Sequence, residues 1–227
     1  MSKENKNSEL DILGLDELEV ENTSVEEIDN ESVNLIFVGI DKSGSMGLYE
    51  DDMRKSLTEF KEALENSKEV DELLVARADF DHESDIGGYK KVSEFDVDYT
   101  TGGGTALYDL IMEGEGKLTD YMQFLKDQGM RVKAVFAIFT DGQDEHSKNV
   151  LSDAKNSVSI LNDKEITTAF ISFGGNAKGI GNALGFKNML DVSSSASELR
   201  KAFNCLSKSV IESSKSVING GENFFTM

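Results

Sequence analysis

Two nearly continuous apolar stretches dominate the chain from residue 33 onward. They are residues 33–40 (VNLIFVGI) and residues 132–139 (VKAVFAIF). Runs of this length, rich in β-branched and aromatic residues, are typical of strands buried on both faces of a sheet. We therefore expect two central strands, each followed by a polar loop.

Shorter patterns predict the remaining elements. Helical spacing of apolar residues or alternation of polar and apolar residues marks strands at 73–80, 89–97, 166–173 and 188–192, and helices at 53–64, 107–125, 148–161, 177–184 and 195–210. The strand at 89–97 alternates most and is expected at an edge of the sheet. Gly114 and Gly116 predict a bend or break within their helix. Ser195 and Glu198 have the spacing of a capping box, and Gly220 and Gly221 are expected to end the last helix.

Alternating strands and helices with buried central strands predict an α/β fold of the doubly wound, Rossmann-like type. Its mostly parallel sheet is covered by helices on both faces. We divide the chain into a tail at 1–32, a domain at 33–218 and a short tail at 219–227. The first tail carries two lysines against eleven acidic residues, a composition that favours disorder. Its apolar residues are either a docking motif for a partner or part of a solvated tail. They are Leu10, Ile12, Leu13, Leu15, Leu18 and Val20.

The overall charge narrows the classes of partner. A formal net charge of -20 disfavours nucleic acid and anionic membranes, and it favours divalent cations and basic surfaces. We find no apolar run of signal-peptide or membrane-spanning length.

The single cysteine, Cys205, lies in an apolar helical pattern and is expected to be a buried, inert thiol. Low cysteine content and the absence of a leader predict a cytoplasmic protein.

Oxygen-bearing side chains follow the two buried strands. Asp41, Ser43 and Ser45 come after the first, and Asp141 comes after the second. Thr105 ends a glycine-rich loop just before a helix. Ligands of open α/β sheets bind beyond the carboxyl ends of the strands, so these side chains are expected to meet in one crevice.

Hydroxyls and carboxylates are the donors that hard cations such as Mg²⁺ or Mn²⁺ prefer. With neutral hydroxyls as direct ligands and carboxylates acting through water, the ion keeps much of its electrophilicity. It can then accept a carboxylate from a partner. The sequence thus predicts a metal centre that binds an acidic group.

This arrangement resembles the metal-ion-dependent adhesion site of von Willebrand factor A domains, the family of integrin inserted domains. The resemblance covers about residues 33–210, and all five family positions match. It implies one antiparallel edge strand and contact of the two serines and the threonine with the ion, the threonine either directly or through water depending on state. The resemblance further implies aspartates that act mainly through water. It also implies a non-enzymatic, protein-binding role with a partner that presents Asp or Glu. AAA+ ATPases of the MoxR type and proteins of stress-response operons, such as tellurite resistance, are the partners that isolated intracellular members of the family suggest.

Residues beside the centre are candidates for a partner-binding rim. They are Lys42, Gly103, Gly104, Asp144 and His146. Their alternative role is an ordinary surface or loop position. The cluster Asp79, Asp81, His82 and Glu83 is either a second cation site, part of the rim, or a solvated acidic loop.

Two other function classes remain open, an enzyme and a self-assembling structural subunit. A metal-assisted phosphohydrolase would use Asp41 but lacks a second carboxylate at Ser43, and a phosphate-binding loop lacks its lysine at Ser45. A Ser-His-Asp hydrolase has only His82 and His146 to draw on. A self-assembling structural subunit would place an acidic residue of one copy on the ion of another.

Overall fold

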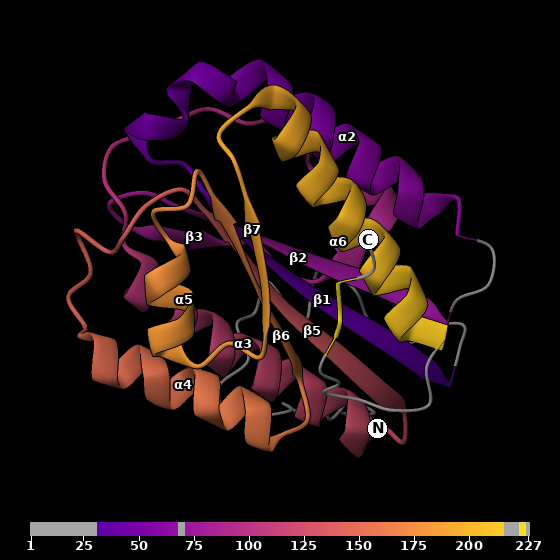
Figure 1. Cartoon of the computed structure of the whole chain (residues 1–227). Helices are drawn as coiled ribbons and strands as arrows, with labels where there is room; N and C mark the ends of the chain where they lie inside the picture. Colours follow the sequence, from indigo (N-terminus) through magenta and orange to yellow (C-terminus); the bar gives the residue numbers. More distant parts are fainter. Residues whose placement is uncertain (1–30, 68–70, 216–222, 226–227) are drawn as a thin grey trace, which may run out of the picture.

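A computed structural model of the chain describes residues 31–67, 71–215 and 223–225. Its sheet has the strand order β3-β2-β1-β5-β6-β7, with β4 also paired to β2 (Figure 1). The strands are β1 (Ser32–Asp41), β2 (Glu72–Phe80), β3 (Ser84–Ile86), β4 (Lys90–Lys91), β5 (Arg131–Thr140), β6 (Thr167–Phe173) and β7 (Asn188–Val192). The two most apolar strands, β1 and β5, are neighbours at the centre of the sheet, as the sequence predicts.

Parallel pairing brings the ends of the central strands together. Strand β1 pairs in parallel with both β2 and β5, and the register sets Ile40 opposite Phe139. Asp41 and Thr140, the next residue on each strand, therefore lie side by side at the carboxyl edge of the sheet. Parallel strands end at the same edge, so the loops after β1 and β5 emerge close to each other.

Helices cover both faces of the sheet. The helices are α2 (Glu50–Glu65), α3 (Leu107–Asp127), α4 (Leu151–Asp163), α5 (Lys178–Leu184) and α6 (Ala196–Lys215), with short 3-10 turns η2 (Gly44–Tyr49) and η3 (Val92–Glu94). Figure 1 shows α2 and α6 on one side and α3, α4 and α5 on the other. Successive residues of β1 point to opposite sides: Ile36 packs in the core under α2 and α6, and Phe37 in the core under α3 and α4. The apolar side chains of β1 in both cores have almost no exposed surface.

The predicted edge strand at 89–97 is wrong in its extent. The chain instead forms the short strands β3 and β4, both antiparallel to β2, and residues 92–94 turn into η3. The alternation of apolar and polar residues at 89–97 does not come from a long strand. It arises because Tyr89, Val92 and Phe95 are buried while the chain turns. One antiparallel edge is nevertheless present, and the fold class is confirmed.

The predicted break in the helix at Gly114 and Gly116 is also wrong, because α3 runs unbroken from Leu107 to Asp127. Gly114 serves close packing: a Cβ placed there would lie 2.5 Å from Cζ of Phe37 and 3.0 Å from Phe136. The glycine lets the helix approach the sheet, and this contact offsets its low helix propensity. Gly116 faces open space.

The last helix begins where the sequence predicts. The hydroxyl of Ser195 accepts the backbone N–H of Glu198, one half of the expected capping box. Gly220 and Gly221, with most of both predicted tails, lie outside the described residues. Within the described part of the chain, no helix is both long and apolar enough to cross a bilayer.

Candidate metal centre

Asp41 is the most buried member of the candidate site and has no exposed surface. Its Oδ1 accepts the backbone N–H of Ser43 at 2.7 Å, and its Oδ2 accepts the hydroxyl of Thr140 from the neighbouring strand. The hydroxyl of Tyr99 donates to the backbone carbonyl of Asp41 at 2.6 Å. Two segments thus hold this carboxylate in one orientation, and Tyr99 from a third segment holds the backbone of Asp41 at the point where β1 ends.

Ser43, Ser45 and Asp141 form a tight oxygen cluster. The two serine hydroxyls lie 3.0 Å apart, and Ser45 and Ser43 donate to the same oxygen of Asp141 at 3.0 Å and 3.4 Å. Ser43 is buried, Asp141 is partly buried and Ser45 is exposed, so the cluster opens toward solvent on one side. The loops after β1 and β5 therefore meet as the sequence predicts.

The glycine loop joins the same cluster. Gly44 N–H donates to Gly103 O at 3.0 Å, and Gly102 N–H donates to Lys42 O at 2.6 Å. Thr105 is buried, and a Cβ placed on Gly142 would lie 3.8 Å from its hydroxyl oxygen. The structure therefore places all five predicted side chains at one end of the sheet, on three loops that contact one another.

Two histidines brace the glycine loop. Their rings meet edge to face with centroids 4.5 Å apart, His82 from the loop after β2 and His146 from the loop after β5. Nδ1 of His146 accepts the backbone N–H of Thr105 at 3.3 Å. A Cβ added to Gly104 would lie 2.0 Å from that nitrogen, and one added to Gly103 would lie 1.8 Å from Nε2 of His82. The loop thus needs glycine because side chains already occupy the space beside it.

The other rim candidates have partners within the domain. Lys42 lies 3.9 Å from Asp79, which also takes two hydrogen bonds from Arg77. Asp144 accepts the backbone N–H of Tyr108 at 3.1 Å, at the start of α3. These contacts give Lys42 and Asp144 structural roles, and their part in partner binding stays a prediction. Asp79 is likewise committed to Arg77, which leaves Asp81, His82 and Glu83 as loop residues around it.

Burial raises the pKa of both aspartates. For Asp41, desolvation raises the pKa from 3.8 to about 6, against the lowering effect of the hydrogen bonds from Thr140 and Ser43, and the nearby charge of Asp141 adds to the rise. Desolvation also raises the pKa of Asp141, while the hydroxyls of Ser45 and Ser43 lower it. Among the described residues, no lysine or arginine forms an ion pair with either of these two carboxylates.

The donor set fits a small hard cation. It offers three hydroxyls and two carboxylates, so all five predicted donors are oxygen atoms. Among the described residues no group of three or more His, Cys, Asp or Glu side chains is arranged to hold a metal, so any ion here depends on the hydroxyls of Ser43, Ser45 and Thr105. A divalent cation would also compensate the two carboxylates whose pKa values are raised. Zinc and iron sites usually include histidine or cysteine ligands.

The sequence patterns did not predict two of the residues that hold Asp41 in place. Thr140 and Tyr99 both hold Asp41, yet neither is a typical metal-binding residue. For Thr140 a signal exists, since a polar residue ends an otherwise apolar strand next to Asp141. Tyr99 comes from a loop 58 residues away, and no sequence pattern reveals its direction.

Comparison with solved structures identifies the architecture. The pilus adhesin SpaC from Lactobacillus rhamnosus GG aligns with 82% of this chain at a TM-score of 0.64 and 13% identity, and this chain spans only 31% of the SpaC chain. A von Willebrand factor type A protein from Catenulispora acidiphila aligns with 79% of this chain and 43% of its own at a TM-score of 0.55 and 15% identity. This chain has a von Willebrand factor A-like fold.

A further solved structure aligns with this chain over nearly the whole of the solved protein's own length. The conserved hypothetical protein BatB from Bacteroides thetaiotaomicron aligns over 80% of this chain and 99% of its own, at a TM-score of 0.52 and 14% identity. No protein-family model and no curated protein sequence matches the chain. The likeness therefore concerns the von Willebrand factor A-like architecture, and the role of the loops at its carboxyl edge rests on their own geometry.

Proposed function

We propose that this von Willebrand factor A-like domain binds Mg²⁺ or Mn²⁺ at its carboxyl edge and uses the ion to hold an acidic side chain of a partner protein. The observation that carries the proposal is the contact of Ser43 and Ser45 with one oxygen of Asp141, beside the buried Asp41. The two serines and Thr105 would hold the ion, and the aspartates would orient those ligands. When bound, the ion supplies a Lewis-acidic position for a carboxylate.

Exposed apolar side chains near the site support a protein as the partner. Among the described residues, the exposed large hydrophobic side chains are Leu48, Val150 and Leu151. Leu48 lies in η2, directly after the serine loop, and the other two begin α4, after the loop of Asp141. Both segments follow strands at the carboxyl edge, one toward each face of the sheet. Apolar residues around a polar centre are typical of protein-binding surfaces.

The similar solved structures support the same class of function. SpaC is named as a pilus adhesin and another neighbour as the PilB minor pilin of Streptococcus sanguinis, at a TM-score of 0.55 and 12% identity. We extend from these only the general role of a protein-interaction module. An AAA+ ATPase or a stress-response protein that presents Asp or Glu remains the proposed type of partner.

A non-enzymatic role is part of the proposal. A phosphohydrolase would need the carboxylate of Asp41 as a nucleophile, but both of its oxygens already accept hydrogen bonds and the side chain has no exposed surface. A nucleophile must reach the reacting atom within about 3.5 Å. The two histidines, which a hydrolase would need, pack against the glycine loop instead.

The first test measures metal uptake by calorimetry. The wild-type chain is expected to bind one Mg²⁺ or Mn²⁺, and Ser45→Ala to bind it at least about tenfold more weakly because one ligand is lost. Ser45 is exposed, so its replacement leaves the core intact. The matched control is Ser152→Ala, an exposed serine on α4. Equal uptake by all three proteins would refute the metal centre.

The second test measures capture of partners. Immobilised wild-type chain is incubated with a synthetic peptide library that carries a central Asp or Glu, in Mg²⁺ and in EDTA. Retention in Mg²⁺ alone, lost for Ser45→Ala and kept for Ser152→Ala, is the expected result. Retention that ignores both EDTA and the Ser45 substitution would contradict the metal bridge.

A further inference from the structure

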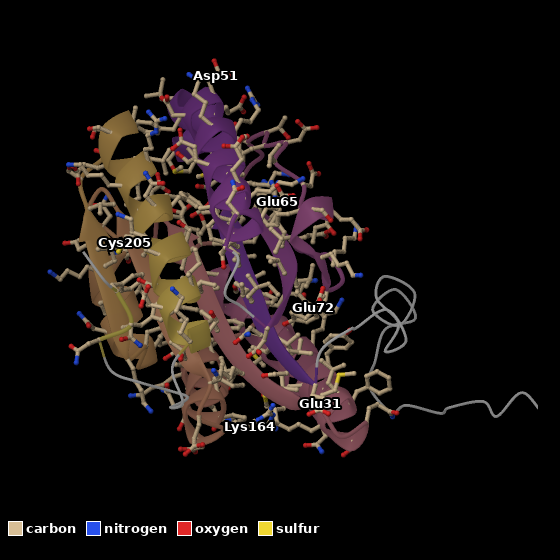
Figure 2. All side chains as sticks on the ribbon, turned by 90° about the vertical axis from the view of Figure 1, so that its right-hand side faces the viewer. Glu31, Asp51, Glu65, Glu72, Lys164 and Cys205 are labelled. Carbon is tan, nitrogen blue, oxygen red and sulfur yellow. The ribbon has the colours of Figure 1, made fainter. Side chains whose placement is uncertain are left out.

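Helix α2 begins at the same end of the domain as the candidate metal centre. Figure 2 shows Asp51, in the first turn of α2, at the end of the domain opposite to Glu31. Glu31 directly precedes β1, and β1 ends at Asp41. The first turn of α2 is therefore placed to contact the loops that carry the predicted metal-binding side chains.

Glu50, the first residue of α2, holds the start of the glycine loop. Its Oε1 accepts the hydroxyl of Thr101 at 2.6 Å and the backbone N–H of the same residue at 2.7 Å. The hydrogen bond from the hydroxyl, followed by the one from the N–H, lowers the pKa of Glu50, so the acceptor is ionised at neutral pH. Hydrogen bonds to a carboxylate are stronger than those between neutral groups. These two join residues that lie 51 positions apart in the chain.

Arg54 holds the same segment one turn further along α2. Its guanidinium donates to the backbone carbonyl of Tyr99 and lies 3.9 Å from Oε2 of Glu50. The hydroxyl of Tyr99 in turn donates to the backbone carbonyl of Asp41. Residues 99–101 are thus attached to α2 at two points and to the end of β1 at a third.

The three glycines that follow Thr101 have no side chains with which to hold the loop. Glycine also has the largest backbone freedom of any residue. Two backbone hydrogen bonds join these glycines to the loop after β1, and at the far end His146 accepts the N–H of Thr105. The loop therefore has one side-chain anchor at each end, and Glu50 supplies the anchor at its start.

We propose that Glu50 is a positioning residue of the metal centre. By anchoring Thr101, it keeps Thr105 in place beside the two serines. This inference rests on the metal-binding function proposed above. Within the described structure Glu50 forms no hydrogen bond with any of the five predicted metal-binding side chains, so it acts through Thr101. Its role is thus distinct from that of an ion ligand, and from the general benefit of an acidic residue in the first turn of a helix.

Two substitutions of Glu50 separate position from charge. Glu50→Gln keeps an oxygen that can accept both hydrogen bonds but removes the negative charge, and Glu50→Ala removes both. By calorimetry, Glu50→Ala is expected to bind Mg²⁺ about tenfold more weakly than wild type, and Glu50→Gln to keep most of the affinity.

Asp52→Ala is the matched control for these substitutions. Asp52 lies in the same turn of α2, its side chain is 35% exposed against 31% for Glu50, and its carboxylate pairs with Lys55 rather than with the loop. We expect this variant to bind Mg²⁺ like wild type. Equal weakening by Glu50→Gln and Glu50→Ala, or a comparable loss in Asp52→Ala, would overturn the proposal, because charge rather than position would then be responsible.

The hydroxyl of Thr101 provides an independent check. Thr101→Val removes this donor and Thr101→Ser retains it, so the valine variant should bind Mg²⁺ more weakly than the serine variant. The double variant Glu50→Ala/Thr101→Val should bind no more weakly than Glu50→Ala alone, because both changes remove the same contact. Additive losses would mean that the two residues act independently, against the proposal.

A further readout needs no metal. Amide hydrogen exchange of the loop is followed by NMR in EDTA. Glu50→Ala should speed the exchange of the Thr101 amide at least about tenfold, while Glu50→Gln and Asp52→Ala stay close to wild type. Unchanged protection of α6 in every variant shows that the domain remains folded. Unchanged exchange of the Thr101 amide in Glu50→Ala would overturn the anchor.

These measurements distinguish failure of this inference from failure of the proposed function. A wild-type chain that takes up neither Mg²⁺ nor Mn²⁺ would refute the metal centre itself. A wild-type chain that binds the ion, together with a Glu50→Ala variant that binds it equally well, would refute only the positioning role of Glu50.

Discussion

The hydroxyl of Thr140 donates a hydrogen bond to Oδ2 of Asp41, joining the ends of β5 and β1 across 99 residues of sequence. Asp41 is fully buried, and its other oxygen is held by the backbone of its own loop. The bond therefore ties the two halves of the candidate metal centre together. It makes the orientation of the carboxylate depend on the register of the sheet.

Replacing Thr140 should reveal this dependence. Thr140→Val keeps the shape but leaves a buried carboxylate oxygen without a donor, which costs about 1–3 kcal/mol of stability. Mg²⁺ affinity should fall roughly 10- to 100-fold, as for other residues that orient ligands. Thr140→Ser retains the hydroxyl and should remain close to wild type. Chemical denaturation and calorimetry measure both effects, and identical metal affinity of the valine and serine variants would show that Thr140 does not orient the centre.

Stability should depend on pH through Asp41. Its pKa is raised by burial from 3.8 to about 6, so the folded state favours the protonated form. The stabilisation is fully present below the unfolded pKa and is lost as the pH rises through about 6, a change on the order of 3 kcal/mol for the metal-free protein. Denaturation between pH 4 and pH 7 in EDTA measures it. Asp41→Asn should remove this component, and a variant with the same pH profile as wild type would exclude Asp41 as its source.

Metal should reverse that trend. In the proposed centre, Mg²⁺ favours the deprotonated form of the aspartates that orient its ligands and therefore competes with protons. The rise in Tm that Mg²⁺ produces should then be larger at pH 7 than at pH 5. The raised pKa of Asp141 acts in the same direction. Thermal melts with Mg²⁺ and with EDTA at the two pH values give the comparison. A shift that is larger at pH 5 would be incompatible with carboxylates in the centre.

The glycine loop should tolerate no side chain at Gly104. In Gly104→Ala the new Cβ would lie 2.0 Å from Nδ1 of His146, so the loop that carries Thr105 must move and Mg²⁺ affinity should fall. Gly142→Ala is the control, since its Cβ would only touch Thr105 at 3.8 Å. The double variant Gly104→Ala/His146→Ala should regain part of the affinity, a coupling of about 0.5–3 kcal/mol. No recovery would mean that the histidine is not the obstacle.

Two glycines of α3 should respond in opposite ways. Gly114→Ala would force a Cβ to within 2.5 Å of Phe37 and should destabilise the fold by about 1–3 kcal/mol. Gly116→Ala meets open space and should stabilise the helix by up to about 1 kcal/mol. Urea denaturation measures both. A neutral or stabilising effect of Gly114→Ala would contradict the tight contact between α3 and β1.

Leu48 should contribute to partner binding without contributing to the fold. It is 89% exposed beside the serine loop, so Leu48→Ser should leave stability and Mg²⁺ affinity unchanged. Burial of this side chain by a partner is worth about 1.5–3 kcal/mol, so retention of an acidic peptide that covers it should weaken at least about tenfold. Unchanged retention of the peptide by Leu48→Ser would show that the peptide does not cover Leu48.

The sequence by itself predicted the main elements and the candidate centre. The apolar runs of β1 and β5 marked them as central strands, and parallel pairing of such strands places Asp41 and Asp141 at one edge of the sheet. The spacing of apolar residues and the polar residues at the strand ends predict these elements, because both patterns lie within a few neighbouring residues. The central place of β1 and β5 followed because only a central position buries both faces of an apolar strand.

Tertiary structure alone decided the rest. The alternation at 89–97 became a short strand and a turn because Tyr89 and Phe95 are buried inward, and Gly114 stayed helical because Phe37 fills the space beside it. Cys205, predicted to be a buried thiol, is instead partly exposed, because it lies on the flank of α6 beside β7, the last strand of the sheet. Tyr99 contacts Asp41, and His146 contacts Thr105, although the residues of each pair lie far apart in the chain. Such contacts depend on how close two packed elements come, and no local pattern of residues encodes that distance.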